Sequence, residues 1–127
     1  MKTIDVVGAV IVDELDRVLC AKRSARMSMP FLWEFPGGKI EEHEEPEVAL
    51  IREIKEELNC QVEVGEQIAD NIYSYPAINV RLITFFATVK EGQPTATEHE
   101  ELRWVPRKEL AKLDWAPADI PTVQALI

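Results

Sequence analysis

Three glutamates near the middle of the chain have the residue type and spacing that phosphate chemistry requires. Glu53, Glu56 and Glu57 fall in the segment EIKEE, and at about 100° per residue they share an arc of roughly 100° on one helix. Carboxylates so close together repel one another unless a cation neutralises them. Mg²⁺ prefers oxygen ligands and binds phosphates at the same time, so the segment predicts a metal site. An ordinary solvated helix face is the alternative, because such runs are common.

The wider segment, residues 38–60, spaces its charged residues in a recognisable way. From its first glycine the chain reads Gly38, five residues, Glu44, seven residues, Arg52-Glu53-Ile54, one residue, Glu56-Glu57. This pattern resembles the Nudix box, the motif of hydrolases that cleave a nucleoside diphosphate linked to a further group. Asn59 and Cys60 depart from the motif, which usually has Gly and an aliphatic residue there. Asn tolerates a left-handed helix cap and Cys is a small hydrophobe, so the chemistry is unaffected.

The resemblance implies a set of metal ligands. The backbone carbonyl of Gly37, with Glu56 and Glu57, is expected to hold Mg²⁺, with Mn²⁺ as a possible substitute. Glu53 lies one turn earlier on the same arc, where it either binds a second metal or orients the attacking water. With carboxylate ligands and a carboxylate base, activity should rise from neutral pH toward about 8 to 9.

Two further charged residues of the box are expected to support this site. Arg52 is predicted to hold Glu44 by a charge-assisted hydrogen bond, which fixes the loop onto the helix. Lys39 can reach a phosphate, although a solvated lysine beside a turn is the alternative.

A second acidic group follows in the loop TATEHEE. Glu98 lies six residues before Trp104, where MutT-type members of the family carry a metal ligand or general base. Its acidic neighbours leave a solvated role open. The two histidines, His43 and His99, each stand alone in an acidic loop, and we expect both to be solvated.

Candidate substrate-binding residues lie on either side of the box. Arg23 ends a predicted strand and is a candidate phosphate or sugar contact, with solvated strand-end charge as the alternative. Glu34, between two aromatic residues, is a further candidate. Asp119 lies in APADIP near a helix start, either as an N-cap or as a reader of the base.

Within the family, WEFPGGKIE and APADIP resemble the MutT and CTP pyrophosphohydrolase branch. The resemblance implies hydrolysis of a nucleoside triphosphate to the monophosphate and pyrophosphate. An ionised Asp119 only accepts hydrogen bonds, which favours the amine of cytosine, so we expect CTP, dCTP or modified pyrimidine nucleotides as substrates. Oxidised dGTP, read by a protonated Asp119, is the alternative. A non-catalytic nucleotide-binding module is the second class, and the complete set of box glutamates argues against it.

The elements that position these residues are read from hydrophobic patterning. Strands are expected at 3–12 and 17–22 as a hairpin, at 61–75 and 78–89 as a second hairpin, and at 102–105. Short helices are expected after residue 106 and around 118–127. The box helix begins at Pro46 and ends before Asn59, with an apolar face formed by Leu50, Ile51, Ile54 and Leu58. The mixture predicts an α+β fold, and the resemblance implies an α/β/α sandwich with a mixed sheet over residues 1–127.

Composition limits the remaining function classes. The chain of 127 residues is sized for one domain and has a net charge of −9, which argues against binding long nucleic acids. A small polyanionic nucleotide is still a suitable partner if metal ions invert the local field. No stretch reads as a signal peptide or membrane span, and Cys20 and Cys60 are expected to be free buried thiols. We therefore expect a cytoplasmic protein, whose oligomeric state the sequence leaves open.

Overall fold

Two β-sheets and one long helix position the functional residues, and the computed structural model describes residues 1–127. The strands, in chain order, are β1 (Thr3–Ile11), β2 (Arg17–Lys22), β3 (Trp33–Glu34), β4 (Gly37–Lys39), β5 (Gln61–Ser74), β6 (Asn79–Glu91) and β7 (Glu101–Pro106). The helices are α1 (Pro46–Leu58), the 3₁₀ turns η1 (Arg107–Lys112) and η2 (Pro117–Asp119), and α2 (Ile120–Leu126).

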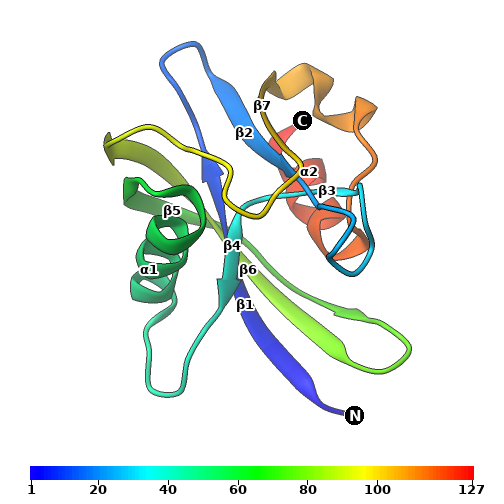
Figure 1. Cartoon of the computed structure of the whole chain (residues 1–127). Helices are drawn as coiled ribbons and strands as arrows, with labels where there is room; N and C mark the ends of the chain where they lie inside the picture. Colours follow the sequence, from blue (N-terminus) through cyan, green and yellow to red (C-terminus); the bar gives the residue numbers. More distant parts are fainter.

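The larger sheet is mixed and has the strand order β4-β1-β6-β5 (Figure 1). β1 runs parallel to β6, while β4 pairs with β1 and β5 pairs with β6 in antiparallel fashion. The smaller sheet, β3-β2-β7, is antiparallel. These sheets with their helices confirm the predicted α+β sandwich with a mixed sheet, and the β5–β6 hairpin is confirmed as well.

The predicted hairpin of strands 3–12 and 17–22 is wrong. Both strands exist, but β1 lies in the larger sheet and β2 in the smaller one, and only an isolated bridge joins Val12 to Val18. β1 is almost fully buried from Val7 to Ile11 because it is an inner strand of the larger sheet. A strand with neighbours on both edges has no hydrogen bonds left for β2, so the turn at 13–16 carries the chain from one sheet to the other.

Helix α1 begins and ends as predicted, but the face that it buries differs from the predicted apolar face by a rotation about the helix axis. Pro46 is in its first turn, and Asn59 caps it in the left-handed region (φ 55°, ψ 39°), donating its N–H to the carbonyl of Lys55. The buried residues are Ala49, Leu50, Ile54 and Leu58, whereas Ile51 is 40% exposed, so its predicted inward position is wrong. The helix turns Glu53 and Glu57 toward β4, and this rotation leaves Ile51 on the outer side of the apolar stripe.

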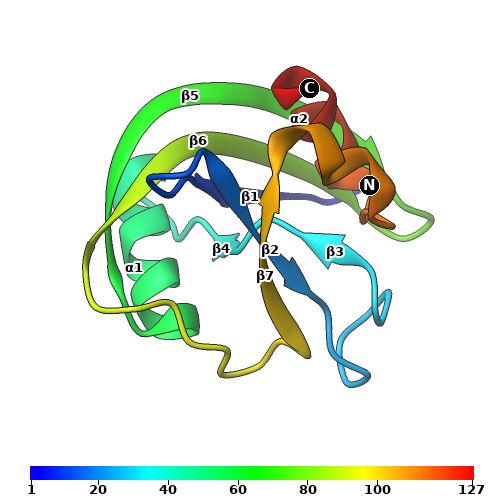
Figure 2. The ribbon, with the colours of Figure 1, turned by 90° about the horizontal axis from the view of Figure 1, so that it is seen from above.

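Two hydrophobic clusters hold these elements together. One packs α1 against the larger sheet, and the other lies between the smaller sheet and the C-terminal helix α2. Figure 2 shows the curved β5–β6 pair with α1 near one end and α2 near the other. Both cysteines are free and buried, as expected. No helix is long and apolar enough to cross a membrane.

Candidate active site

The two glycines of β4 bring the backbone against the carboxylates of α1. A Cβ atom on Gly38 would lie 2.3 Å from the Cδ atom of Glu53, and one on Gly37 would lie 1.9 Å from the backbone oxygen of Val7. The N–H of Gly37 donates to Oε1 of Glu57 at 3.4 Å. Only glycine permits this approach, which places the Gly37 peptide beside the acids predicted to bind metal.

Burial sets the electrostatics of these acids. Removal from water raises the pKa of Glu57 to about 7, and the nearby charge of Glu34 raises it further, against the opposing charge of His99. Burial also raises the pKa of Glu53, against the opposing charge of Arg52. A carboxyl whose pKa lies near 7 can lose its proton to solvent and bind a cation in its place near neutral pH.

Arg52 contacts several carboxylates of the box. Its Nε and Nη2 atoms donate to Glu44 at 2.8 and 2.9 Å, which confirms the predicted contact, and Nη2 also donates to the carbonyl of Lys39 at 3.0 Å. Its Nη1 atom lies 3.6 Å from carboxylate oxygens of both Glu53 and Glu56. The hydrogen bonds from Arg52 lower the pKa of the Glu44 carboxyl to about 2, so the Arg52–Glu44 pair is charged at every physiological pH.

The predicted metal ligands are near one another but do not form a closed cage. No group of three or more Asp, Glu, His or Cys side chains converges closely enough to hold a metal ion unaided. The side chain of Glu56 is 62% exposed, while that of Glu53 is largely covered. Mg²⁺ usually binds one or two carboxylates and takes its other ligands from water and substrate phosphates. The partly buried Glu57, the exposed Glu56 side chain and the Gly37 carbonyl supply hard oxygen donors that fit this open coordination.

A buried histidine joins the site, contrary to expectation. The side chain of His99 is fully covered, and its Nε2 atom donates to Oε2 of Glu34 at 2.8 Å. Burial lowers the pKa of His99, but the Glu34 bond and the charges of Glu57 and Glu34 outweigh it, and the pKa is raised overall. Its Nδ1 atom has no partner. His43, by contrast, is exposed as predicted.

Glu34 also receives Arg23, so one carboxylate bridges two cations. Nη1 of Arg23 lies 2.5 Å from Oε1 of Glu34, and the two side chains are each 17% exposed. The predicted substrate candidates Arg23 and Glu34 are thus a preformed pair. No local pattern marks His99 as their partner, because it lies 65 residues from Glu34 in the chain.

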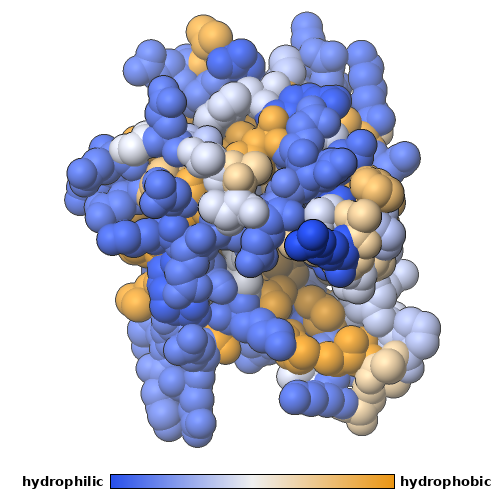
Figure 3. Space-filling view, in the orientation of Figure 1, coloured by the Kyte–Doolittle hydropathy of each residue, from blue (hydrophilic) through white to orange (hydrophobic).

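A hollow of about 340 Å³ adjoins this network. Its apolar floor comes from β1 and β6, through Ile4, Val6, Val80 and Leu82, and Figure 3 shows apolar surface gathered in a depression over these strands. Its polar lining includes the predicted residues Arg23, Glu34, Gly37, Lys39, Glu57 and Asp119. An apolar slot that ends at carboxylates suits a planar base joined to a phosphate chain.

Asp119 closes the inner end of the hollow and does not cap the helix. No side-chain cap hydrogen bond is present at α2, and Oδ1 of Asp119 instead accepts from the N–H of Phe35 at 3.0 Å. Burial raises the pKa of Asp119 to about 8, against the opposing effect of the Phe35 bond. The carboxyl is therefore available to a ligand as a neutral acid or, when a donor faces it, as a carboxylate.

Glu98 is not among the residues that the hollow brings together. It is exposed and lines a separate depression with Ser24–Met27 and Thr97. Both of its neighbours hold the loop at the site: Thr97 Oγ1 donates to the carbonyl of Glu57 at 2.7 Å, and His99 is anchored on Glu34.

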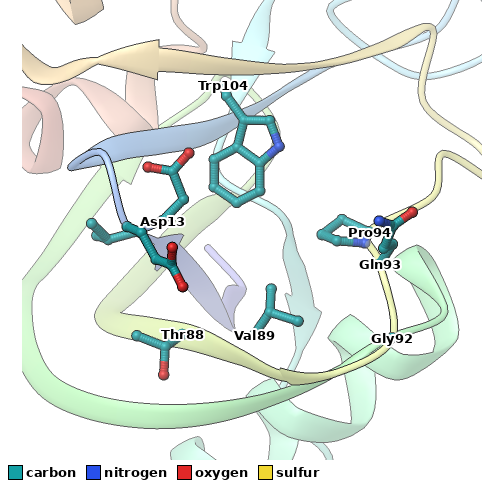
Figure 4. A pocket seen from close by; sticks show the side chains of 9 residues that line it. Asp13, Thr88, Val89, Gly92, Gln93, Pro94 and Trp104 are labelled. Carbon is teal, nitrogen blue, oxygen red and sulfur yellow. The ribbon is translucent and has the colours of Figure 1, made fainter.

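A larger hollow, of about 730 Å³, lies elsewhere. Figure 4 shows the indole of Trp104 reaching into it near Asp13, with Pro94 on the opposite side. It contains none of the predicted site residues, and the carboxylate of Asp13 is already bonded to Arg17. The smaller hollow beside α1 is therefore the candidate active site.

Comparison with known proteins gives one consistent result. The family model described as NUDIX domain matches residues 2–126. The chain is 36% identical to the CTP pyrophosphohydrolase of Escherichia coli K12, over 100% of this chain and 93% of that protein. It is 29% identical to the 8-oxo-dGTP diphosphatase of the same organism, over 99% and 98% of the two chains. The solution structure of MutT from methicillin-resistant Staphylococcus aureus 252 is 47% identical, with a TM-score of 0.80 over 99% of this chain and 97% of that one.

Proposed function

The chain belongs to the NUDIX family of hydrolases, and from this premise we propose that it is a Mg²⁺-dependent pyrophosphohydrolase of nucleoside triphosphates, releasing the monophosphate and pyrophosphate. The observation that carries the proposal is the partly buried carboxyl of Glu57, bonded to the Gly37 peptide at the edge of a hollow that also contains Asp119. Glu57 and Gly37 would face the metal ion and the phosphates at one end of the hollow, and Asp119 would face the base at the other.

Each box residue has a part in this proposal. Glu56, Glu57 and the Gly37 carbonyl would hold Mg²⁺, or Mn²⁺ in its place, which when bound neutralises phosphate charge and lets a nucleophile approach. Glu53, held below Gly38, orients the attacking water or contributes to a second metal. Arg52 fixes Glu44 and keeps the loop on the helix.

The substrate end involves the residues outside the box. Arg23, held by Glu34, and the exposed Lys39 are proposed contacts for the sugar and phosphates. Glu98 is the proposed general base or additional metal ligand, carried by the loop that His99 anchors. This role requires the exposed side chain of Glu98 to extend toward the phosphates of a bound substrate, because it does not line the hollow.

Cytosine nucleotides or modified pyrimidines are the proposed substrates. Asp119 can accept the exocyclic amine of cytosine, and the resemblance to the E. coli CTP pyrophosphohydrolase supports this choice. Oxidised dGTP is the second candidate, and the raised pKa of Asp119 favours it, because a neutral acid can donate to a purine O6. A non-catalytic sensor is disfavoured because every box glutamate is present.

We place this activity in a single Nudix domain spanning residues 1–127. The two free buried thiols fit a reducing, cytoplasmic compartment, in which nucleoside triphosphates are present.

Pyrophosphate release tests the proposal directly. The protein is incubated with CTP, dCTP, UTP, ATP, GTP and 8-oxo-dGTP, with Mg²⁺ and with a chelator. We expect release that requires Mg²⁺ and is fastest for a cytosine nucleotide, with 8-oxo-dGTP as the competing outcome. Absence of release from every nucleotide in the presence of Mg²⁺ would refute the enzyme and favour the binding module.

A further inference from the structure

Tyr75 places a hydroxyl group in the hollow beside Asp119. It follows β5 at the tip of the β5–β6 hairpin, where its N–H donates to the carbonyl of Ile78 at 2.8 Å. Its Oη atom accepts the N–H of Ala118 at 3.3 Å. Both Tyr75 and Asp119 line the hollow, and burial raises the pKa of Tyr75, with the nearby charge of Asp119 raising it further against the opposing effect of the Ala118 bond.

The direction of this hydrogen bond decides what Tyr75 offers a ligand. A phenol has one proton to donate and can also accept, and here its acceptor side is occupied by a backbone N–H. No protein group receives the hydroxyl proton, so Tyr75 has a free donor, and its oxygen is fixed by Ala118. Asp119, the next residue after Ala118, has Oδ1 bonded to Phe35 while Oδ2 has no protein partner.

We infer that Tyr75 is a second base-reading residue, whose hydroxyl donates to a ring-nitrogen acceptor while Asp119 accepts the exocyclic amine next to it. The inference deepens the proposed function, because it names the edge of the base that the hollow selects. Cytosine presents this edge through its N4 amine and N3 nitrogen. A hydrogen bond from the bound amine also stabilises the carboxylate form of Asp119.

The inferred pair selects the edge of the base and not the size of its ring, because adenine presents a similar amine and ring nitrogen. Uracil and thymine present a ring N–H at the position of the cytosine N3, and two donors would then face each other. Tyr75 therefore disfavours them even if Asp119 adapts its protonation.

A binding experiment tests Tyr75 without relying on turnover. The affinities of CMP and 3-deaza-CMP, which replaces the ring acceptor by C–H, are measured by calorimetry in metal-free buffer. The proteins are the unaltered chain, Tyr75→Phe and Tyr73→Phe. Tyr73 is the matched control, because its ring packs on Tyr75 with centroids 4.7 Å apart but it does not line the hollow.

We expect Tyr75→Phe to weaken CMP binding roughly two- to tenfold, the range for one hydrogen bond, and to leave 3-deaza-CMP binding unchanged. Tyr73→Phe should bind both ligands as the unaltered chain does. Equal weakening of both ligands in Tyr75→Phe, no weakening of either, or no CMP binding by the unaltered chain would each overturn the inference.

The outcome is separable from that of the proposed function. If no nucleotide releases pyrophosphate while the acceptor-dependent loss persists, the enzyme proposal fails and Tyr75 still reads the base. If CTP is hydrolysed but Tyr75→Phe retains the unaltered preference for CMP over 3-deaza-CMP, the activity stands and Tyr75 has only a packing role. Thermal unfolding of Tyr75→Phe checks that loss of the Ala118 partner leaves the hairpin folded.

Discussion

Glu57 shows how a single residue acquires its chemistry from the fold. In the sequence it is one of three similar glutamates, but in the structure it is partly buried, bonded to the Gly37 peptide and close to the charge of Glu34. Glu56, its neighbour, is largely exposed. The three glutamates therefore differ in their surroundings, because the helix turns Glu53 and Glu57 toward β4 and leaves Glu56 exposed.

Replacing Glu57 separates the function of this residue from its effect on stability. Glu57→Gln should reduce turnover by at least about a hundredfold, because a principal metal ligand is lost. The folded-state pKa of Glu57, about 7, lies above its ordinary value of 4.5, so the metal-free protein loses stability as pH rises between these values. Glu57→Gln removes that loss and should unfold at a higher temperature than the unaltered protein at pH 8.

Steady-state pyrophosphate release and thermal unfolding in chelator provide the two measurements. The exposed Glu47, in the first turn of the same helix, supplies a control through Glu47→Gln, which should change neither strongly. Near-normal turnover by folded Glu57→Gln would remove this residue from the metal site.

Among the elements, the short strand β4 has the least room for side chains. Its residues Gly37 and Gly38 sit between β1 and α1, where a side chain would meet the backbone of Val7 in one case and the Glu53 carboxylate in the other. The backbone cannot move aside, but the end of a glutamate side chain can. Gly37 is therefore needed for the packing of β4 against β1, whereas Gly38 is needed for the position of the Glu53 carboxylate.

This difference predicts opposite results from the same substitution. Gly37→Ala should destabilise the fold by at least about 1–3 kcal/mol, as overpacking does, and lower the midpoint of urea unfolding. Gly38→Ala should leave the midpoint nearly unchanged while displacing Glu53 and lowering kcat more than it changes KM. Equal unfolding midpoints for the two variants would contradict the different contacts of the two glycines.

At the scale of the whole molecule, acidity is the dominant feature. A chain with a net charge of −9 binds a polyanion, and the site must therefore gain positive charge before the substrate enters. If Glu57 holds Mg²⁺ as proposed, protons compete with the ion for this residue, because a ligand carboxyl must be deprotonated. Activity and metal binding are consequently coupled through pH.

The pH profile should report this competition. With the pKa of Glu57 raised to about 7, activity should increase as pH rises through 7 and reach its plateau near about 8 to 9. Raising the Mg²⁺ concentration should move the acidic limb of the profile to lower pH, since the ion displaces the proton. Rates measured from pH 5 to 9 at several Mg²⁺ concentrations test this, and an optimum near pH 5 would require another mechanism.

The sequence by itself determined the box helix, its Pro46 and Asn59 ends, the Arg52–Glu44 contact and the β5–β6 hairpin, and it supplied the residue types of the proposed metal site. These features depend on neighbours within one or two turns, or on a motif that fixes its own spacing. Tertiary structure alone decided that β1 and β2 join different sheets, that Ile51 faces outward, and that His99 and Asp119 are buried. His99 meets Glu34 across 65 residues and Asp119 meets Phe35 across 84, and burial at such a distance depends on how whole sheets pack.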